Sequence, residues 1–288
     1  MDSIELNAPA KINLLLDIVG ILPNGYHDMQ MIMQSISLYD KIRIMKNKMN
    51  KVNIFCDDYR VPTNMTNTAF KAAMSFFEKC NITDFGVNIS IKKNIPSQSG
   101  MGGGSADAAA VLIGLNKLFN TNMTSSQLAD IGKEIGADIP FCIYGGTALV
   151  QGIGEKVILL APLPHCYIAI AKPKKGVCTK HAFAKFDSLA SCEHPNIKLL
   201  IDEIANADIN KVAKSMGHVL EAVCDVQEVF KIKEEMTSMG AIGAMMSGSG
   251  STVFGIFNDE SKAKACVNSL SNTYFTALTS PVKAYNNV

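Results

Sequence analysis

The chain contains a glycine-rich stretch at residues 95–110, in which four of the five positions 100–104 are glycine. A strand-like run at residues 87–91 precedes it, and an alanine-rich run typical of a helix continues from it to Leu118. Because glycine has no Cβ atom, such a loop turns sharply and brings its backbone N–H groups close to a ligand. The first turn of the following helix adds unpaired N–H groups and the positive end of its dipole. The stretch therefore predicts a phosphate-binding loop.

A flexible surface linker is the alternative interpretation of these glycines. Linkers rarely lead directly into a strong helix, however, and here Ser105 stands where a helix N-cap residue is expected. The loop lacks two common nucleotide-binding signatures. The Walker spacing G-x-x-x-x-G-K-[ST] occurs nowhere in the sequence, and Ser105 occupies the position where the dinucleotide pattern G-x-G-x-x-G requires a glycine. A different class of phosphate loop is therefore expected.

Two short segments are similar to motifs of protein kinases, namely Asp84–Gly86 and Ala169–Lys172. No H-R-D catalytic loop accompanies them, and Asp84 precedes the glycine-rich stretch, whereas the corresponding kinase motif follows its glycine loop. We therefore interpret the first segment as a turn and the second as a core strand, and we reject a protein kinase.

The charge balance is even, with 27 basic and 26 acidic residues and a net charge of +1. No overall field therefore favours nucleic acid or an anionic membrane as a partner. No apolar run approaches the roughly 20 residues that cross a bilayer, and the N-terminal residues lack the basic and apolar regions of a signal peptide. The eight cysteines are scattered without any C-x-x-C spacing, which indicates reduced thiols. We expect a cytoplasmic protein.

Strand-like and helix-like runs alternate without a strict βαβ order, which predicts an α+β protein of two layered domains. The turn at Pro162–Pro164 is the expected boundary, so the domains would be 1–162 and 163–288. Expected strands lie at 11–18, 29–37, 41–45, 52–56, 87–91, 147–150, 157–160, 166–171, on both sides of 247–250, and at 274–278. Expected helices lie at 67–79, 105–118, 124–135, 196–204, 226–239 and 261–270.

Three further clusters are each unremarkable when considered alone. Lys11 and Asn13 lie two residues apart on the polar face of an expected strand, Asp138 follows a helix stop at Gly136, and residues 246–251 form a loop of small residues. A strand-edge charge, a helix cap and a hairpin turn would explain them separately. Their order along one chain, together with the glycine-rich stretch, indicates a common site.

In this arrangement the sequence resembles the superfamily of galactokinase, homoserine, mevalonate and phosphomevalonate kinases, the GHMP kinases. Residues 9–14, 96–109 and 247–250 match its three motifs. The resemblance runs from Ala8 to about Phe257 and is weakest between Cys178 and Met239. It implies a two-domain GHMP kinase fold, with an N-terminal domain like ribosomal protein S5 domain 2 and a ferredoxin-like C-terminal domain.

Within the superfamily, residues 24–27, 136–141 and 145–149 are similar to the branch that acts on cytidyl-diphosphate-linked methylerythritol. This resemblance implies transfer of the γ-phosphate of ATP to the 2-hydroxyl of that small molecule, in the non-mevalonate route to isoprenoid precursors. It also implies ATP and Mg²⁺ as cofactors. ATP and the catalytic pair would belong to the N-terminal domain and the substrate side to the C-terminal domain. We expect a monomer or weak homodimer that binds neither nucleic acid nor membrane.

The resemblance also implies roles for individual residues. A tertiary alcohol is a poor nucleophile until its proton is removed, and Asp138 matches the base, with Lys11 stabilising its charged carboxylate and orienting the hydroxyl. The residues matching nucleotide-binding positions are Asn67, Pro96, Ser97, Gln98, Ser99, Gly100, Met101, Gly102, Gly103, Gly104, Ser105, Ala106 and Asp107. The residues matching substrate-binding positions are Asn13, Tyr26, His27, Thr179, Phe183, Gly248, Ser249 and Gly250. Tyr26 would stack on the cytosine, and His27 would meet its hydrogen-bonding edge.

One departure from the family pattern concerns the metal. Many relatives have two consecutive serines after the glycines, whereas here Ala106 follows Ser105, so Ser105 alone or water would contact Mg²⁺. Two alternatives remain open. A homoserine or mevalonate kinase would keep the glycine loop without the Tyr26–His27 site. A non-catalytic ATP sensor would not need both Lys11 and Asp138.

Overall fold

The computed structural model describes residues 2–284. Met1, the first residue of the expected N-terminal domain, and residues 285–288, the last of the expected C-terminal domain, lie outside the described residues. The described chain forms a seven-stranded sheet and a four-stranded sheet, both covered by helices. This mixture confirms the α+β class. Among residues 2–284, no helix combines the length and the apolarity that a bilayer crossing demands.

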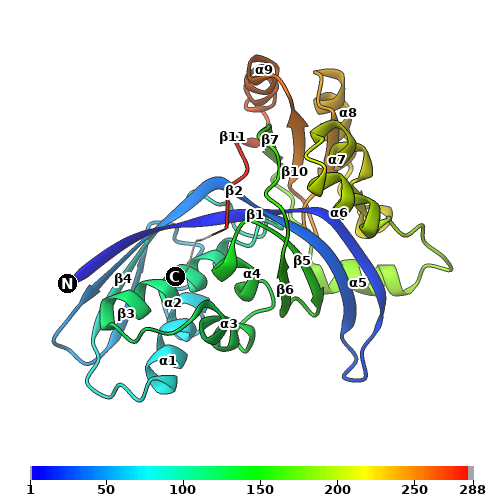
Figure 1. Ribbon diagram of the computed structural model, residues 1–288. Coiled ribbons are helices and arrows are strands. Elements are labelled where there is room, and N and C mark those ends of the chain that lie inside the picture. The colour runs from blue at the N-terminus through cyan, green and yellow to red at the C-terminus, as the bar shows by residue number, and fades with distance from the viewer. Residues whose placement is uncertain (1, 285–288) are drawn as a thin grey trace.

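Two long strands dominate the first sheet and form an arc across the molecule (Figure 1). They are β1 (Ser3–Ile21) and β2 (His27–Lys46), which pair antiparallel. The strand order is β3-β4-β2-β1-β8, while β5 pairs with β2 and β6 with β5. The shorter strands are β3 (Val52–Cys56), β4 (Val87–Lys92), β5 (Thr147–Gly152), β6 (Lys156–Leu159) and β8 (Gly217–His218).

One face of this sheet is covered by α1 (Thr68–Lys79), α2 (Gly103–Phe119), α3 (Ser125–Lys133) and α4 (Ile139–Tyr144) (Figure 1). Helix α2 lies at the centre of this layer and is buried on nearly all sides, because its residues are mostly alanine and aliphatic. Gly114 lets α2 approach the sheet closely. A Cβ atom there would lie 2.6 Å from Ile44 Cδ1 and 2.8 Å from Leu6 Cδ1.

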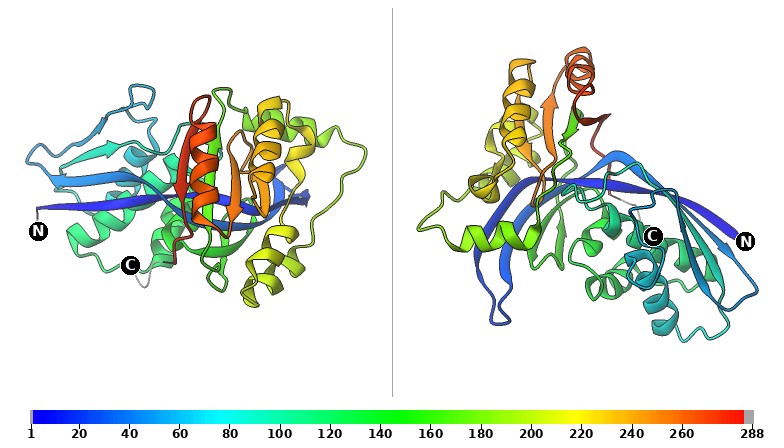
Figure 2. Two further views of the ribbon diagram at one scale, coloured as in Figure 1. Left: turned by 90° about the horizontal axis from the view of Figure 1, so that it is seen from above. Right: turned by 180° about the vertical axis from the view of Figure 1, so that it is seen from behind.

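The second sheet has the antiparallel order β11-β7-β10-β9. Its strands are β7 (Tyr167–Lys172), β9 (Gly243–Met246), β10 (Val253–Phe257) and β11 (Phe275–Thr279). Helices α8 (Gln227–Ser238) and α9 (Glu260–Leu270) pack against it (Figure 2). Between β7 and α8 the chain forms α5 (Thr179–Asp187), α6 (Ile197–Ala205), α7 (Ile209–Ser215) and a 3₁₀ turn at Val219–Val223.

Several expectations from the sequence were wrong in detail. The strands expected at 29–37 and 41–45 are one continuous strand, β2, because a register shift opposite Pro9 and Ala10 absorbs the break in pattern. Helices α4, α5 and α7 and strand β8 were not expected from the sequence. Lys11 and Asn13 do not lie on a solvated face, since both are buried. Lys11 lines a cleft, and Asn13 accepts a hydrogen bond from its ammonium group.

The expected boundary at residue 162 remains a prediction. Strand β8 comes from the second half of the chain but pairs in parallel with β1, placing Gly217 opposite Leu15 and His218 opposite Leu16. Near the C-terminus, isolated bridges join Pro281 to Ile36 and Ala284 to Gly145. Segments from both halves therefore complete the first sheet. This crossing brings His218 beside the strand that carries Lys11.

Candidate active site

A cleft of about 1360 Å³ lies where the two halves of the chain meet. Two loops border it. The first, residues 96–104, is called the glycine loop below, and the second, residues 247–252, is called the serine–glycine loop. The turn between β1 and β2 and one side of α5, from Thr179 to Asp187, line its other end. The cleft therefore collects segments that are far apart in the sequence.

Within the glycine loop, Gly102 has a left-handed backbone with φ of 69° and acts as the N-cap of α2. The expectation that Ser105 caps this helix was wrong, because the helix begins at Gly103 and no side-chain hydrogen bond caps it. Ser105 instead lies in the first turn and lines the cleft. An uncapped helix N-terminus leaves backbone N–H groups for an anion.

Lys11 and Asp138 lie together at the floor of the cleft. Lys11 Nζ is 3.6 Å from Asp138 Oδ2 and donates a hydrogen bond of 2.7 Å to Asn13 Oδ1. The Lys11 side chain is buried, whereas the Asp138 side chain is 31% exposed and remains accessible from the cleft. The backbone N–H of Lys11 donates to Met101 O at 3.0 Å, which fixes the glycine loop on β1.

The serine–glycine loop is held against the same strand. The Gly248 N–H donates to Asn13 Oδ1 at 3.0 Å, and Ser247 Oγ donates to Gly100 O at 3.1 Å. Gly248 has a φ of 58°, and a Cβ atom there would lie 2.8 Å from Gly100 O. Glycine is therefore required at position 248 by both its conformation and its contact with the glycine loop.

His218, which no sequence motif marks as part of the site, supports the serine–glycine loop through a hydrogen bond. Its Nε2 donates to Gly248 O at 2.8 Å, while its Nδ1 accepts from the Leu220 N–H at 3.2 Å. Burial lowers the pKa of His218 to about 3, so the ring is neutral and its tautomer is set by these two partners. Asn13 and His218 thus bind the N–H and the carbonyl oxygen of the same residue, Gly248.

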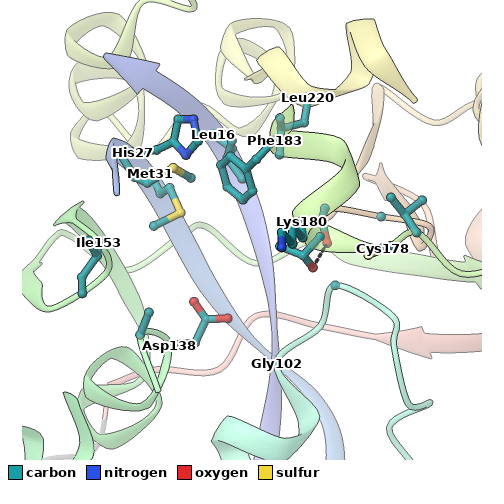
Figure 3. Close-up of a pocket in the computed structure, with 18 of the residues that line it drawn as sticks. Leu16, His27, Met31, Gly102, Asp138, Ile153, Cys178, Lys180, Phe183 and Leu220 are labelled. Atoms are coloured by element: carbon teal, nitrogen blue, oxygen red, sulfur yellow. Dashed lines mark hydrogen bonds between the residues drawn. The ribbon is translucent and has the colours of Figure 1, made fainter. Parts of the chain in front are cut away.

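The far end of the cleft contains the expected substrate side. His27 stacks on Phe183 with ring centroids 4.6 Å apart, and His27 Nε2 donates to Asp187 Oδ1 at 2.7 Å. These rings lie away from Asp138 and Gly102 (Figure 3). Tyr26 is 62% exposed at the rim. The hydroxyl groups of Thr179 and Ser249 are 2.8 Å apart and join α5 to the serine–glycine loop.

The remaining expected nucleotide residues divide into three groups. Gln98, Gly100, Gly102 and Ser105 line the cleft, and Gly103 and Gly104 form the start of α2. Pro96 and Ser97 line a second cavity of about 780 Å³ on the other side of the glycine loop, together with Arg60, Lys93, Lys172 and Lys174. Ser99, Met101, Ala106 and Asp107 are buried beneath the loop.

Asn67 lines neither cavity. Its Oδ1 accepts from the Ala69 N–H at 2.8 Å and its Nδ2 donates to Pro62 O at 2.6 Å, so its amide caps α1 and fixes the preceding turn. The adjacent Thr68 Oγ1 donates to Gly104 O at 2.8 Å. Asn67 therefore lies one residue from a contact with the glycine loop, and its expected role at the adenine remains a prediction.

Sequence motifs alone do not identify four residues that lie in or beside the two cavities, namely Asp187, Lys180, Lys93 and His218. The first two lie on α5, which was not expected because its segment resembles the family weakly; both line the cleft. Lys93 lies three residues before Pro96, outside the matched motif. His218 has no sequence signal, because its role depends on the pairing of β8 with β1.

The side chains around the cleft could bind Mg²⁺ only if phosphate groups of a bound ligand supplied further oxygen ligands. Within residues 2–284, no group of three or more His, Cys, Asp or Glu side chains could hold a metal ion. The Ser105 hydroxyl and the Asp138 carboxylate supply oxygen atoms, which Mg²⁺ prefers. Because Mg²⁺ normally keeps several waters and binds substrate phosphates, these donors are compatible with it.

Comparisons with known proteins agree with this geometry. Residues 67–146 match the GHMP kinases N terminal domain, and residues 200–276 match the GHMP kinases C terminal domain. A 4-diphosphocytidyl-2-C-methyl-D-erythritol kinase of Clostridium perfringens is 45% identical over 272 residues, covering 94% of each chain. The enzyme of the same name from Lachnospira eligens is 45% identical over 268 residues, covering 92% of this chain and 93% of its own.

Solved structures share the fold. A crystal structure of 4-(cytidine 5'-diphospho)-2C-methyl-D-erythritol kinase superposes with a TM-score of 0.82 at 26% identity, covering 96% of this chain and 99% of its own. A homoserine kinase from Cytophaga hutchinsonii, 20% identical, shares the fold with a TM-score of 0.78, covering 100% of this chain and 98% of its own. The GHMP kinase fold expected from the sequence is thereby confirmed. The chain is a small-molecule kinase of the GHMP superfamily and belongs, within it, to the family of 4-diphosphocytidyl-2-C-methyl-D-erythritol kinases.

Proposed function

We propose that the protein transfers the γ-phosphate of ATP to the 2-hydroxyl of 4-diphosphocytidyl-2-C-methyl-D-erythritol, giving the 2-phosphate and ADP, in non-mevalonate isoprenoid precursor synthesis. The observation that carries this proposal is the position of the Lys11–Asp138 pair between the glycine loop and the aromatic end of the cleft. A donor phosphate at the loop and a hydroxyl on a cytidyl substrate could meet at this pair. Family membership at 45% identity supports the same substrate.

In this proposal Asp138 is the catalytic base. Its carboxylate faces the cleft and takes the proton of the tertiary 2-hydroxyl as the oxygen attacks the γ-phosphorus. The Lys11 side chain is buried, and its ammonium group lies within reach of both Asp138 and Asn13. It holds the carboxylate in position and attracts the negative charge that develops on the transferring phosphoryl group.

The phosphates of ATP bind the glycine loop and the uncapped N-terminus of α2 through backbone N–H groups. The adenine side belongs to the second cavity, which Pro96 and Ser97 of the glycine loop line together with Arg60 and Lys172. Asn67 supports this side through the turn that it fixes. Ser105 is the residue that would contact Mg²⁺, which when bound neutralises phosphate charge.

The cytidyl group binds at the far end of the cleft. Tyr26 stacks on the cytosine, and His27 meets the hydrogen-bonding edge of the base with its ring fixed by Phe183 and Asp187. Thr179 and residues 248–250 line the path between the cytosine and the catalytic pair, and Asn13 fixes this side by accepting the Gly248 N–H. A small acceptor such as homoserine or mevalonate would leave this end of the cleft empty.

We also propose a cytoplasmic enzyme that acts as a monomer or weak homodimer and binds neither nucleic acid nor membrane. The even balance of 27 basic and 26 acidic residues supports the absence of polyanionic partners. Light scattering across a range of protein concentrations tests the oligomeric state, and a stable higher oligomer would contradict it.

Phosphate transfer to three acceptors tests the central proposal. The cytidyl substrate, homoserine and mevalonate are each supplied with ATP and Mg²⁺, and ADP release is followed. We expect turnover with the cytidyl substrate alone. Preference for homoserine or mevalonate would reject the cytidyl assignment, and ATP binding without turnover of any acceptor would favour a nucleotide sensor.

A further inference from the structure

A cysteine, a histidine and an aspartate lie together outside the cleft, where the proposed function does not use them. Cys192 and His194 lie in the segment between α5 and α6, and Asp17 lies on β1. Cys192 Sγ is 3.5 Å from His194 Nε2, and His194 Nδ1 is 2.8 Å from Asp17 Oδ1. The three side chains therefore form a continuous set of polar contacts with the imidazole in the middle.

The contact with Asp17 decides which ring nitrogen of His194 carries the proton. A carboxylate only accepts hydrogen bonds, so His194 Nδ1 donates to Asp17, and His194 Nε2 presents its lone pair to the thiol of Cys192. The Asp17 side chain is 8% exposed, and its Oδ1 also accepts the Ile18 N–H at 2.8 Å, which fixes the carboxylate. A base that lies beside a thiol and is oriented by a third group is the arrangement that activates a cysteine as a nucleophile.

The other cysteines lack this arrangement. Burial raises the pKa of six thiols, which makes them poor nucleophiles at neutral pH. They belong to Cys56, Cys80, Cys142, Cys166, Cys224 and Cys266. Cys178 is exposed, but within residues 2–284 it makes no hydrogen bond to an imidazole. Cys192 is only half-buried, so it combines access to solvent with a neighbouring base.

Cys192 also lines a cavity of about 320 Å³. Phe186 and Leu189 line it from the α5 side, and Val19 and Ile21 line it from the end of β1. Both β1 residues are exposed, so the cavity is open to solvent. Its volume lies at the lower end of the range of roughly 300–1,000 Å³ that is typical of small-ligand sites. A small organic group attached to the sulfur therefore has room beside it.

This cavity shares two residues with the cleft. His27 and Asp187 line both. His27 Nε2 donates to Asp187 Oδ1 at 2.7 Å, and the His27 ring stacks on Phe183 with centroids 4.6 Å apart. A group held in the cavity would lie against this pair and would disturb the His27 ring at the far end of the cleft.

We propose that Cys192 is a modification site: its thiol forms a mixed disulfide with a low-molecular-weight disulfide, and the attached group weakens binding of the cytidyl substrate through His27 and Asp187. The thiol proton passes to His194 Nε2 while the sulfur attacks one sulfur of the small disulfide. A new S–S bond forms, the old one breaks, and the leaving thiolate takes the proton from His194. Cys192 is oxidised and the released thiol is reduced, so the small disulfide is the only oxidant required. The effect on substrate binding rests on the proposed function, whereas the exchange reaction does not.

The exposed Cys178 serves as an internal standard for the reactivity of Cys192. The protein is treated with 2-hydroxyethyl disulfide, an uncharged probe, the remaining thiols are alkylated after timed intervals, and mass spectrometry reports the labelled fraction at each cysteine. We expect Cys192 to react about three- to tenfold faster than Cys178 although it is less exposed, because a base lies beside its thiol.

The variant His194→Gln removes the base but keeps an N–H that can reach Asp17. Labelling of Cys192 should slow about three- to tenfold, while the rate at Cys178 stays the same. If His194 only held its segment against β1, the variant would free the segment, and labelling of Cys192 would be unchanged or faster. That result would overturn the nucleophile assignment. His165→Gln replaces an exposed histidine beside Tyr167 and should change neither rate.

The effect on the cleft is measured in Cys178→Ser, so that labelling is directed to Cys192. After treatment with the probe, we expect the KM for the cytidyl substrate to rise about three- to tenfold, the size expected for one displaced hydrogen bond. The KM for ATP should stay nearly constant, and dithiothreitol should reverse the change. The double variant Cys178→Ser/Cys192→Ala is the matched control, and the probe should not alter its KM values.

The outcomes separate this inference from the proposed function. Labelling of Cys192 no faster than that of Cys178 would overturn the modification site. A mixed disulfide at Cys192 that leaves the KM for the cytidyl substrate unchanged would overturn its link to the cleft. A parent protein that turns over no cytidyl substrate would reject the proposed function and with it the effect on substrate binding, whereas the labelling rates would still decide the modification site.

Discussion

Lys11 Nζ lies 3.6 Å from Asp138 Oδ2, and the same ammonium group donates to Asn13 Oδ1 at 2.7 Å. Asn13 Oδ1 also accepts the Gly248 N–H, and the carbonyl oxygen of Gly248 accepts from His218 Nε2. A continuous set of polar contacts therefore runs from the candidate base to the serine–glycine loop. Its members come from β1, the start of α4, β8 and the loop after β9, so the site exists only in the complete fold.

The first prediction concerns the catalytic pair. Asp138→Asn keeps the shape of the side chain but removes the base, so turnover should fall about 10²–10⁴-fold while the dissociation constant of ATP stays nearly unchanged. Lys11→Met should also lower turnover strongly. In the double variant the two losses should not add, because the residues act as a unit. Strictly additive losses would mean that they act independently, and turnover within about threefold of the parent would exclude Asp138 as the base.

The second prediction concerns Gly102, whose left-handed backbone directs a substituted side chain at the catalytic pair. A Cβ atom there would lie 3.1 Å from Lys11 Cγ and 3.8 Å from Asp138 Oδ2. Gly102→Val should therefore weaken ATP binding and lower turnover together. Gly104→Ala is the matched control, because Gly104 is helical and its Cβ would approach only Thr68 Oγ1, at 3.3 Å. Unchanged ATP affinity in a folded Gly102→Val protein would show that the glycine loop does not bind phosphate and would favour the interpretation as a flexible linker.

Much of this site could be predicted because its signals are local. The glycine loop, the expected strand at β3 and the capping box of α3, in which Thr124 and Gln127 exchange hydrogen bonds, all follow from neighbouring residues. His218 could not be predicted, since a two-residue strand has no periodicity and its partner Leu16 is 202 positions away. Asp107 was expected among the phosphate ligands, but nothing in its own motif indicates that Lys93 and Asp40 bury its carboxylate.

The third prediction uses His218 as a donor to Gly248 O. His218→Leu leaves that peptide oxygen without its partner, which should misplace the serine–glycine loop and lower turnover about tenfold, as about 1.4 kcal/mol corresponds to a factor of ten. His218→Gln can still place an N–H near the oxygen and should restore most of the activity. Thermal unfolding measured in parallel separates the two effects. Equal turnover in the Leu and Gln variants would show that the hydrogen bond to Gly248 O does not contribute to turnover.

The fourth prediction concerns Tyr26 and the cytosine. Stacking of a base on an aromatic ring is worth about 1–3 kcal/mol, so Tyr26→Ala should raise the KM for the cytidyl substrate about ten- to hundredfold. The KM for ATP should hardly change, because the glycine loop lies at the other end of the cleft. Tyr59→Ala is a suitable control, since Tyr59 is 95% exposed and lines neither cavity. Equal damage to both KM values would contradict a cytosine-specific role.

The last prediction concerns stability and follows from the pKa of Asp107, which burial raises to about 7. The folded protein holds this proton up to about pH 7, whereas the unfolded chain releases it near the ordinary pKa of 3.8. Between these values the native state binds more protons, so this group's contribution to the free energy of unfolding falls as the pH rises, by at most about 1.4 kcal/mol per pH unit. The contribution is fully present below pH 3.8, is lost by about pH 7 and changes little above it.

Asparagine at position 107 cannot take part in this exchange of protons. The melting temperature of Asp107→Asn relative to the parent should therefore rise between pH 4.5 and 7.5 and then level off. Other carboxylates, such as Asp58 with its lowered pKa, act in the opposite direction but equally in both proteins, so the difference isolates Asp107. A constant difference in melting temperature across this range would show that Asp107 is already ionised in the folded protein at pH 4.5.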